Sequence, residues 1–594
     1  MDDQNKNLIL ATVLSFVVIA VWFFLFPPEE LATTATEPTV AEQTAATTAP
    51  TAESVATDGT TTASPTLSTE AEVGRITIDS PELTGSINLR GGRIDDVYLS
   101  GYRETIEEDS PTVRLLRPYG ENDAYFAGFG WIGNVGVAAN AVPGPDTIWT
   151  LDAGETLTPT TPVTLKWDNG AGLVFRTTYS IDEKFMISVE QTVENNSGQE
   201  VTVTPYGLIR RYTEPDGLKR FFVLFEGLVR MNNGSLDQIS YKDIREENSG
   251  TNSEDVTAGG WIGYTDHYWM TTLIPDQDKP FQAVSRYFTT DVYEADAILG
   301  QELVAAGATA QVSSRLFVGA KEWETIRAYQ NDNNVHGFIN TIDWGWFFFL
   351  TKPIFWLLHN IHALIGNMGW SIMALTLVLK ALVLPLAYKS YVSMAKMKEL
   401  QPEMEKLKEA AGDDRAKLQQ GMMKLYRDNK VNPASGCLPM LIQIPIFFSL
   451  YKVIFVTLEL RQAPWLGWIR DLSAPDPSSI LNLFGLLPYA TPEPGSMFFI
   501  LSLGVLPIIL GISMWLQQKL NPAPTDPSQK MIFAFMPWIF MFMLGGFASG
   551  LVLYWITNNT ITFLQQYAIM RSHGHRPDIL GNIFSRKSKA KAAK

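Results

Sequence analysis

Long apolar stretches in the C-terminal half constrain the fold of this chain more than any other feature of its sequence. Each has about 20 residues or more, the length that an α-helix needs to cross roughly 30 Å of hydrocarbon. The last stretch, residues 531–570, is too long for one crossing, and the glycines around Gly546 indicate a reversal that divides it into two helices. Together with an apolar N-terminal segment, these stretches predict a multi-domain membrane protein with an α-helical core of six transmembrane helices.

The N-terminal segment, residues 8–26, is apolar along almost its whole length. It could be a cleaved signal peptide, but no small-residue cleavage site follows it, so an uncleaved transmembrane anchor is the favoured interpretation. Residues 29–74 contain no Lys or Arg and are rich in Thr, Ala, Pro and Glu. This composition predicts a disordered tether on the periplasmic side of the membrane.

Residues 75–335 consist of short runs in which apolar and polar residues alternate, for example from Phe185 to Glu194. Such alternation, with turn signals such as Asn195-Asn-Ser-Gly, predicts antiparallel strands. About 260 residues are too many for one small sandwich. We therefore expect a periplasmic all-β domain with two packed sheets.

Composition and motifs exclude several kinds of function. The net charge of -16 argues against nucleic acid as the main partner. The single cysteine, Cys437, cannot form a disulfide bond within the chain, so we expect the exported part to fold without disulfides. We find no phosphate-binding loop, no HExxH motif and no histidine base inside a predicted span. We therefore expect no enzymatic activity, no cofactor, no metal and no small-molecule substrate.

The rest of the chain divides according to its hydropathy and charge. We predict an interfacial amphipathic helix at 341–362, transmembrane helices at 366–388, 436–460, 497–518, 531–547 and 549–570, a cytoplasmic helical hairpin at 391–430, a periplasmic loop at 461–496, a cytoplasmic loop at 519–530 and a basic cytoplasmic tail at 571–594. The aromatic-rich helix could instead pack on the β domain. The tail carries seven Lys and Arg residues against one acid, so the positive-inside rule predicts that both termini are cytoplasmic.

Lys380 is an ionisable residue in the middle of a predicted span, where a charge costs roughly 2.5–3.5 kcal/mol on insertion scales. Lys389, at the cytoplasmic end, is about 13 Å of helix rise away, about twice the reach of a lysine stem, so snorkelling explains Lys380 poorly. A buried carboxylate partner is the second explanation, but no Asp or Glu lies inside the other predicted spans. We therefore favour a water-filled groove that contains an unpaired positive charge.

Neutral polar side chains in the spans could hold water around this cation. They are Thr376, Gln443, Ser449, Thr557, Asn558, Asn559, Gln565 and Gln566. A second lysine in a span, Lys452, could reach outward or towards Glu459.

Methionines recur at helical spacing in the predicted hairpin, at Met394, Met397, Met404 and Met422. They could form the seam of a self-packed coiled coil. Methionine is also the adaptable residue of promiscuous binding surfaces, so the same side chains could dock a cytoplasmic partner. The two interpretations are compatible, and both stay open.

Several motifs follow one another in a fixed order between residues 340 and 570. They are Asn367-Met-Gly-Trp-Ser-Ile, Leu384-Pro-Leu, Ser393-Met-Ala-Lys-Met-Lys, Leu400-Gln-Pro-Glu, Val431-Asn-Pro-Ala-Ser-Gly-Cys-Leu-Pro, Leu441-Ile-Gln-Ile-Pro-Ile-Phe, Glu459-Leu-Arg-Gln-Ala-Pro, Asp526-Pro, Pro537 and Ser549-Gly-Leu-Val-Leu-Tyr-Trp. In this order they resemble the YidC/Oxa/Alb family of membrane protein insertases, in its Gram-negative form with a large periplasmic domain. The β domain and the first anchor resemble that form more loosely.

The resemblance implies a five-helix core around a hydrophilic groove that is open to the cytoplasm and lipid and closed to the periplasm. It implies that Lys380 stands where the family usually has arginine, and that Thr376, Gln443, Tyr554 and Trp555 line the groove. Lysine keeps the charge but lacks the planar fork of arginine, which suggests point-charge attraction rather than bidentate recognition. For the β domain, the resemblance implies a supersandwich fold similar to sugar-binding folds.

The function implied is insertion and folding of nascent transmembrane segments in the bacterial inner membrane, alone or with the Sec translocon. The partners would be nascent membrane proteins, the Sec translocon, the ribosome and membrane lipid. An intramembrane serine protease is a poor alternative, because Phe547 replaces the glycine that its motif needs before Ser549. A transporter or channel with a ligand-binding β domain is another alternative, and carbohydrate binding by that domain stays open.

Overall fold

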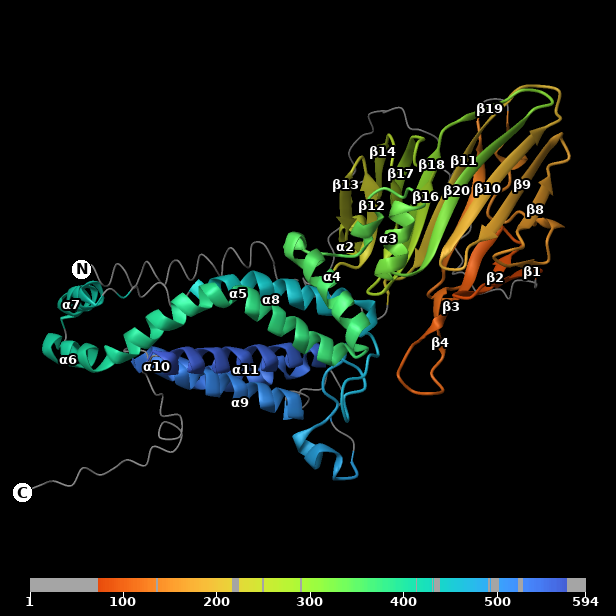
Figure 1. Cartoon of the computed structure of the whole chain (residues 1–594). Coiled ribbons are helices and arrows are strands. Elements are labelled where there is room, and N and C mark those ends of the chain that lie inside the picture. Colours follow the sequence, from red (N-terminus) through yellow and green to blue (C-terminus); the bar gives the residue numbers. More distant parts are fainter. Residues whose placement is uncertain are drawn as a thin grey trace, which may run out of the picture. The chain divides into compact units, whose positions relative to one another are not determined.

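The structure, a computed structural model of the chain, describes residues 73–573 with gaps at 135–136, 216–223, 248–249, 289–290, 413, 430, 432–437, 490–491, 493–500 and 522–526. The predicted anchor at 8–26, almost all of the predicted tether, and the tail beyond residue 573 lie outside the described residues. Within the described part, β-strands come first and long helices follow (Figure 1).

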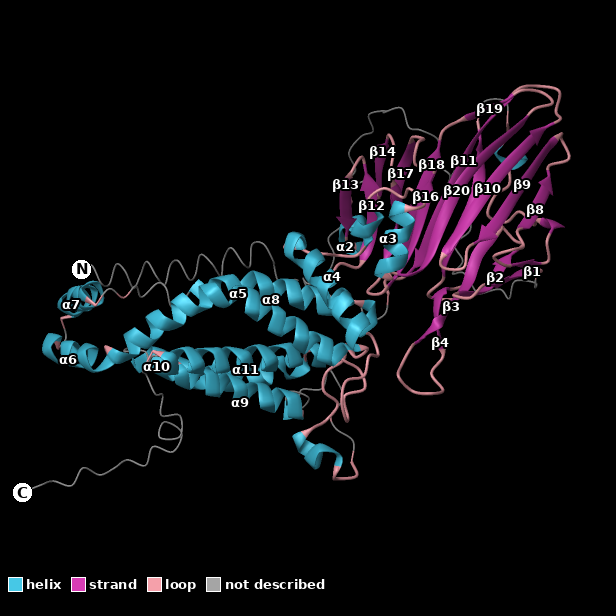
Figure 2. Ribbon diagram, in the orientation of Figure 1, coloured by secondary structure: helices cyan, strands magenta, loops and turns pink. Residues whose placement is uncertain are grey.

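The strands form two sheets, one of 11 strands and one of 9 (Figure 2). Their bounds are β1 Arg75–Asp79, β2 Leu83–Asn88, β3 Arg93–Arg103, β4 Thr112–Leu116, β5 Tyr125–Gly133, β6 Thr150–Ala153, β7 Thr156–Leu157, β8 Val163–Asp168, β9 Leu173–Ile181, β10 Met186–Asn195, β11 Val201–Tyr212, β12 Gly227–Asn232, β13 Ser235–Ile239, β14 Thr251–Val256, β15 Trp261–Thr265, β16 Trp269–Pro275, β17 Phe281–Phe288, β18 Val292–Leu299, β19 Glu302–Val304 and β20 Thr309–Ala320. Two short helices, α2 (Tyr241–Glu246) and α3 (Trp323–Asn331), belong to the same domain.

The larger sheet has the order β14-β17-β18-β11-β5-β3-β2-β1-β7, with β19 paired to β11 and β4 paired to β3. The smaller sheet has the order β13-β12-β15-β16-β20-β10-β9-β8-β6. The described strand pairs are antiparallel except β1 with β7, which is parallel. The predicted two-sheet β domain is therefore confirmed.

Alternation of side chains explains why the two sheets pack face to face. In β9, Phe175 and Tyr179 are buried in the core between the sheets. The residues that directly follow them, Arg176 and Ser180, point to the opposite face of the sheet. Buried apolar side chains from both sheets form one continuous hydrophobic core. The largest of them is Trp261, whose indole Nε1 donates a hydrogen bond of 3.0 Å to the carbonyl oxygen of His336.

The helical part begins with α4 (Phe348–Ile365) and α5 (Met368–Glu399). The elements that follow are α6 (Gln401–Ala411), α7 (Arg415–Asp428), α8 (Leu438–Val456), the 3-10 turns η5 (Leu458–Leu460) and η6 (Ile480–Gly485), α9 (Val505–Leu520), α10 (Pro527–Met543), η8 (Leu544–Gly546) and α11 (Ser549–Ser572). Among the described residues, α4 and α5 are long and apolar enough to cross a membrane, and shorter apolar helices lie at Gln443–Val456, Val505–Leu520 and Met531–Gly546. The count of six transmembrane helices remains a prediction.

The structure corrects the predicted boundary between the second span and the hairpin. Helix α5 does not end at residue 388 but continues to Glu399. The charged residues after Lys389 are compatible with a helix, and the first interruption comes before Pro402, which stands in the first turn of α6. The predicted hairpin at 391–430 therefore starts inside α5, and its two arms are α6 and α7.

Three other helix starts also differ from the predicted ones. Helix α4 begins at Phe348 rather than near 341, because η3 (Phe338–Thr341) and the left-handed Gly345 come first. Helix α9 begins at Val505 rather than at 497, because Gly504 is extended and the carbonyl of the preceding Leu503 accepts a hydrogen bond from the loop. Helix α10 begins at Pro527 rather than at 531.

Helices α4, α5, α8, α9 and α11 share a second hydrophobic core, to which Ile354, Ile372, Leu450, Leu506 and Val552 contribute. A close approach at the start of α5 requires a glycine. A Cβ on Gly369 would lie 2.1 Å from Cδ1 of Trp465, so a larger residue there would displace this tryptophan. The core thus joins α5 to the loop that follows α8.

Candidate functional site

Lys380 lies on α5 in the part that faces α8 and α11. Its ammonium group is half-buried, and Nζ donates a hydrogen bond of 3.1 Å to Oε1 of Gln443 on α8. The amide nitrogen of Gln443 in turn donates a hydrogen bond of 2.7 Å to the hydroxyl of Tyr554 on α11. One polar chain, Lys380–Gln443–Tyr554, therefore joins three apolar helices.

No carboxylate in the described part of the chain forms an ion pair with Lys380, so its hydrogen-bond partner is the neutral Gln443. Thr376, one helical turn before Lys380, is buried, and its hydroxyl donates to the carbonyl of Ile372 at 2.7 Å. This bond inside the helix leaves only the hydroxyl oxygen as an acceptor. Thr376 therefore adds an acceptor oxygen beside Lys380.

A small cavity adjoins this polar chain. It is lined by Thr376, Leu379, Lys380, Val383, Gln443, Ile446, Leu450, Tyr554 and Asn558, and its volume is about 20 Å³. That volume accommodates about one water molecule. The structure thus brings Lys380, Thr376, Gln443 and Tyr554 together, but the space between them is much narrower than a groove.

Trp555 does not line this cavity, and its expected place in the groove stays a prediction. Consecutive residues on a helix point about 100° apart, so Tyr554 faces the cavity while Trp555 faces α8 and α10. The ring of Trp555 lies 5.0 Å from Phe447 and 5.9 Å from Phe540, centroid to centroid. Asn558, one helical turn after Tyr554, lines the cavity instead of Trp555. Asn558 is one of the neutral polar residues that the sequence already placed in the spans.

Lys452 forms an ion pair with Asp343, so it reaches neither outward nor towards Glu459. The carboxylate of Asp343 also accepts backbone hydrogen bonds from Phe225 at 3.0 Å and from Gly345 at 3.1 Å. Helix α8 ends at Val456, and Glu459 in η5 contacts His359 at 2.9 Å instead. The second lysine is therefore a structural residue of the region before α4.

Three of the four methionines singled out in the hairpin pack inside the hairpin itself. Met397, Met404 and Met422 contact a cluster formed with Leu400 and Val431. Met394 lies on the extension of α5, as Met397 does, but it belongs to another cluster, around Tyr391 and Ile569. The geometry favours the self-packed interpretation, whereas docking of a partner stays a prediction.

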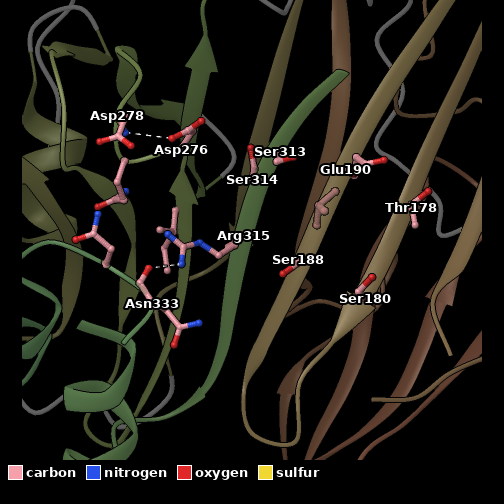
Figure 3. A pocket seen from close by; sticks show the side chains of 14 residues that line it. Thr178, Ser180, Ser188, Glu190, Asp276, Asp278, Ser313, Ser314, Arg315 and Asn333 are labelled. Carbon is pink, nitrogen blue, oxygen red and sulfur yellow. Dashed lines mark hydrogen bonds between the residues drawn. The ribbon is translucent and has the colours of Figure 1, made fainter. Parts of the chain in front are cut away.

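The β domain has a separate and larger cavity of about 440 Å³ on the outer face of the smaller sheet (Figure 3). Its floor consists of two rows across β9, β10 and β20, which the strand registers align. The rows are Ser180–Ser188–Arg315 and Thr178–Glu190–Ser313.

Asp276 to Asp278 and Asn333 form the wall of this cavity, and Arg315 donates to the carbonyl of Asn333 at 2.8 Å. Burial lowers the pKa of Arg315 below its usual value. None of the lining residues is aromatic, so the cavity offers hydroxyls and charges but no surface for ring stacking.

The two parts of the chain match two family models. Residues 75–357 match the YidC periplasmic domain, and residues 360–576 match the 60Kd inner membrane protein. The membrane protein insertase YidC of Ruegeria pomeroyi is 59% identical over 610 residues, which cover 99% of this chain and 100% of the relative. The YidC insertase of Dinoroseobacter shibae is 57% identical over 604 residues, covering 100% of this chain and 99% of the relative.

A solved structure of an active YidC insertase with the first transmembrane domain resolved covers 83% of this chain and 92% of its own, with 21% identity and a TM-score of 0.35. A galactose mutarotase related enzyme from Lactobacillus acidophilus covers 41% of this chain and 97% of its own, with 11% identity and a TM-score of 0.30.

The two family matches, together with a large β domain followed by apolar helices, define an inner-membrane protein with a periplasmic domain. The chain belongs to the YidC family of membrane protein insertases. Its relatives are insertases and not enzymes, which agrees with the expectation that this chain is not an enzyme.

Proposed function

We propose that this chain inserts and folds nascent transmembrane segments in the inner membrane, alone or with the Sec translocon, at the cavity between α5, α8 and α11. Lys380 supplies a positive charge there, and Gln443 and Tyr554 hold it in place. The observation that carries the proposal is the half-buried ammonium group of Lys380, which has a neutral amide as its hydrogen-bond partner between apolar helices.

A neutral partner suits a site at which the partner must be exchanged. A carboxylate attracts the ammonium group with a full negative charge, which is about 1 kcal/mol at 4 Å in water and about 4 kcal/mol at an effective dielectric constant of 20, whereas the amide of Gln443 is neutral. An acidic residue of an arriving segment can therefore displace Gln443 from Lys380, and Gln443 can return when the segment leaves. The bond from Gln443 to Tyr554 keeps the amide close during this exchange. A permanent carboxylate partner would compete with the substrate instead.

Passage of a segment requires the helices to separate, because the cavity has room for about one water molecule. Prolines inside the helices make such bending easier, since each removes a backbone hydrogen bond. Pro385 stands in α5 shortly after Lys380, and Pro445 stands in α8 two residues after Gln443. Both helices can thus bend beside the polar chain that closes the cavity.

The proposed arrangement in the membrane has α5, α8, α9, α10 and α11 around the groove and both chain termini in the cytoplasm. Helix α4 lies in the interface of the periplasmic leaflet. Its exposed aromatic side chains support this position, because tryptophan and other aromatic rings favour the headgroup region; they include Phe348, Phe349 and Trp356.

The proposed partners besides nascent membrane proteins are the Sec translocon, the ribosome and membrane lipid. The hairpin and the basic tail, which lies outside the described residues, are the parts that would meet the ribosome. In the hairpin, Met423 is an exposed apolar side chain available for contact. The cations of the tail would add contacts that weaken with salt.

The proposed function predicts that the purified protein inserts a small two-span test protein into vesicles without any other factor. A variant that lacks residues 75–334 should still insert it at a detectable rate, because the polar chain and its cavity belong entirely to α5, α8 and α11. Insertion would be measured by protease protection of the translocated loop.

Vesicles without protein are the control for spontaneous insertion. Failure of the full-length protein would contradict autonomous insertion. Failure of the deletion variant alone, in a form that still folds and enters the vesicle, would instead assign the β domain to the mechanism.

A further inference from the structure

Residues 477–489, called the apolar loop below, lie between α8 and α9 in the sequence and expose many large apolar side chains. The exposed side chains are Ile480, Leu481, Leu483, Phe484, Leu486, Leu487 and Tyr489. Leu486 is 83% exposed. Contiguous exposed apolar surface of this kind marks a contact with lipid or with another protein.

The sequence around these side chains is free of charge. Between Asp476 and Glu493 there is no Asp, Glu, Lys, Arg or His. A loop that lies in water is normally polar. The absence of ionisable groups removes the main cost of entering a lipid environment.

Hydrogen bonds fix the apolar loop to the start of α9. The carboxylate of Asp476 accepts from the backbone of Leu506 at 2.8 Å, and the hydroxyl of Ser478 accepts from that of Val505 at 3.0 Å. The backbone of Ile480 donates to Leu503 at 2.8 Å. The apolar surface of the loop is therefore joined to that of α9, where Ile509 is exposed as well.

The backbone of the apolar loop satisfies many of its own hydrogen bonds. Phe484 donates to Ser479 at 2.7 Å, and Leu487 donates to Asn482 at 3.0 Å. The hydroxyl of Tyr489 donates to the carbonyl of Leu481. A segment can enter lipid only when its backbone groups are paired internally. The coiled conformation of this loop goes far towards meeting that condition.

We propose that the apolar loop, part of the predicted periplasmic loop at 461–496, inserts into the periplasmic leaflet and is covered by lipid. Figure 1 shows the light-blue loop projecting sideways from the bundle, on the side opposite α4. Aromatic α4 and the apolar loop would thus contact the same leaflet on two sides of the groove helices. This lipid contact is independent of the proposed insertase function.

The test is the depth of a nitroxide spin label at Leu486 in vesicles of phosphatidylethanolamine and phosphatidylglycerol, containing the purified protein alone. The label is attached to the cysteine of the Leu486→Cys variant, in which Cys437→Ser removes the native thiol. Its accessibility to oxygen and to a water-soluble nickel complex, which is present on both sides of the vesicle membrane, is then measured. Leu382→Cys on α5 and Leu303→Cys on β19, which are 70% and 64% exposed, are the lipid and water references. Because Leu486 is so exposed, the substitution leaves packing intact.

The expected oxygen-to-nickel accessibility ratio at position 486 is several-fold higher than at 303 and close to that at 382. A ratio equal to that at 303 would place the loop in water and overturn the proposal. Low accessibility to both reagents would also overturn it, because a protein, such as a second copy of this chain, would then cover the loop. Wild-type insertion by the labelled protein would show that each result belongs to a functional molecule.

Discussion

Replacing Lys380 with alanine is expected to reduce insertion of substrates with acidic translocated tails by about tenfold. Two opposite charges 4 Å apart attract by about 1 kcal/mol in water and about 4 kcal/mol at an effective dielectric constant of 20. The half-buried ammonium of Lys380 lies between these limits, and a loss of about 1.4 kcal/mol corresponds to tenfold. The measurement is the translocated fraction of the test substrate in reconstituted vesicles.

Lys380→Arg and Lys380→Met are the matched controls for this prediction. Arginine keeps the charge and should keep insertion, whereas methionine keeps the apolar length and should behave like alanine. A substrate whose tail carries no acidic residue should be affected little by any of the three variants. Equal insertion of acidic-tailed substrates by the wild type and the methionine variant would contradict the proposal that the charge of Lys380 attracts the substrate.

Replacing Asp343 with asparagine is expected to destabilise the helical part by about 3 kcal/mol, because Lys452 would lose its ion-pair partner. Breaking a buried ion pair by changing one partner typically costs about 3–5 kcal/mol. Both side chains are buried enough for this range, with exposures of 16% for Asp343 and 9% for Lys452. The backbone of Phe225 donates to Oδ2 of Asp343 and the backbone of Gly345 donates to Oδ1, so asparagine, with one oxygen, keeps one of these two bonds and loses the charge and the other.

A double variant distinguishes the ion pair from other effects of the substitution. Asp343→Asn with Lys452→Met removes both charges and keeps an acceptor for the backbone, and removing both members of a buried pair costs much less than leaving one of them unpaired. We therefore expect the double variant to unfold closer to the wild type than either single variant does, as measured by the unfolding midpoint in detergent. A midpoint unchanged by Asp343→Asn would show that the pair contributes nothing.

The sequence predicts Lys380 as the central residue because charge in an apolar span has few explanations. The absence of acidic residues from the other spans also correctly excludes a carboxylate partner within the described helices. The identity of the partner depends on how α5 and α8 are aligned, and hydropathy contains no information on that alignment. The polar pattern offers Gln443 as one of eight neutral candidates and the resemblance places it in the groove, but neither predicts that it bonds Lys380 directly, and the small size of the cavity could not be predicted at all.

The other differences between the predicted and the observed structure also have physical causes. Lys452 and Asp343 are far apart in sequence, so no local signal joins them. Lys389 suggests the end of a span, but charge does not end a helix, and α5 continues to Glu399. Hydropathy and charge predict a loop over 461–496, yet only the structure shows that its apolar side chains after Asp476 are exposed.

The β domain is predicted better because its signal is local. Alternation in β9 and β10 marks the buried face of each strand, and the turn between them is short. The strand order of the two sheets, by contrast, depends on contacts between distant strands such as β11 with β5. The alternation of apolar and polar residues within one strand does not indicate which distant strand it pairs with.

The central claim is that a nascent segment passes beside Lys380, and photo-crosslinking from neighbouring residues of one helix tests it most directly. A photoreactive amino acid is placed at Val383, which lines the cavity, or at Leu382, which is 70% exposed on the outer side of α5. Ile446 and Ile444 form a second pair on α8, since Ile446 lines the cavity and Ile444 is exposed. Each variant is combined with a ribosome-bound, stalled transmembrane segment.

The two positions of each pair lie at nearly the same depth in the membrane but point in different directions from the helix. A difference in crosslinking within a pair therefore shows whether the segment lies in the groove or in the surrounding lipid. The account predicts strong crosslinks to the nascent segment from Val383 and Ile446 and weak ones from Leu382 and Ile444. Crosslinks of equal strength within both pairs, or stronger ones from the exposed positions, would contradict passage through the site of Lys380.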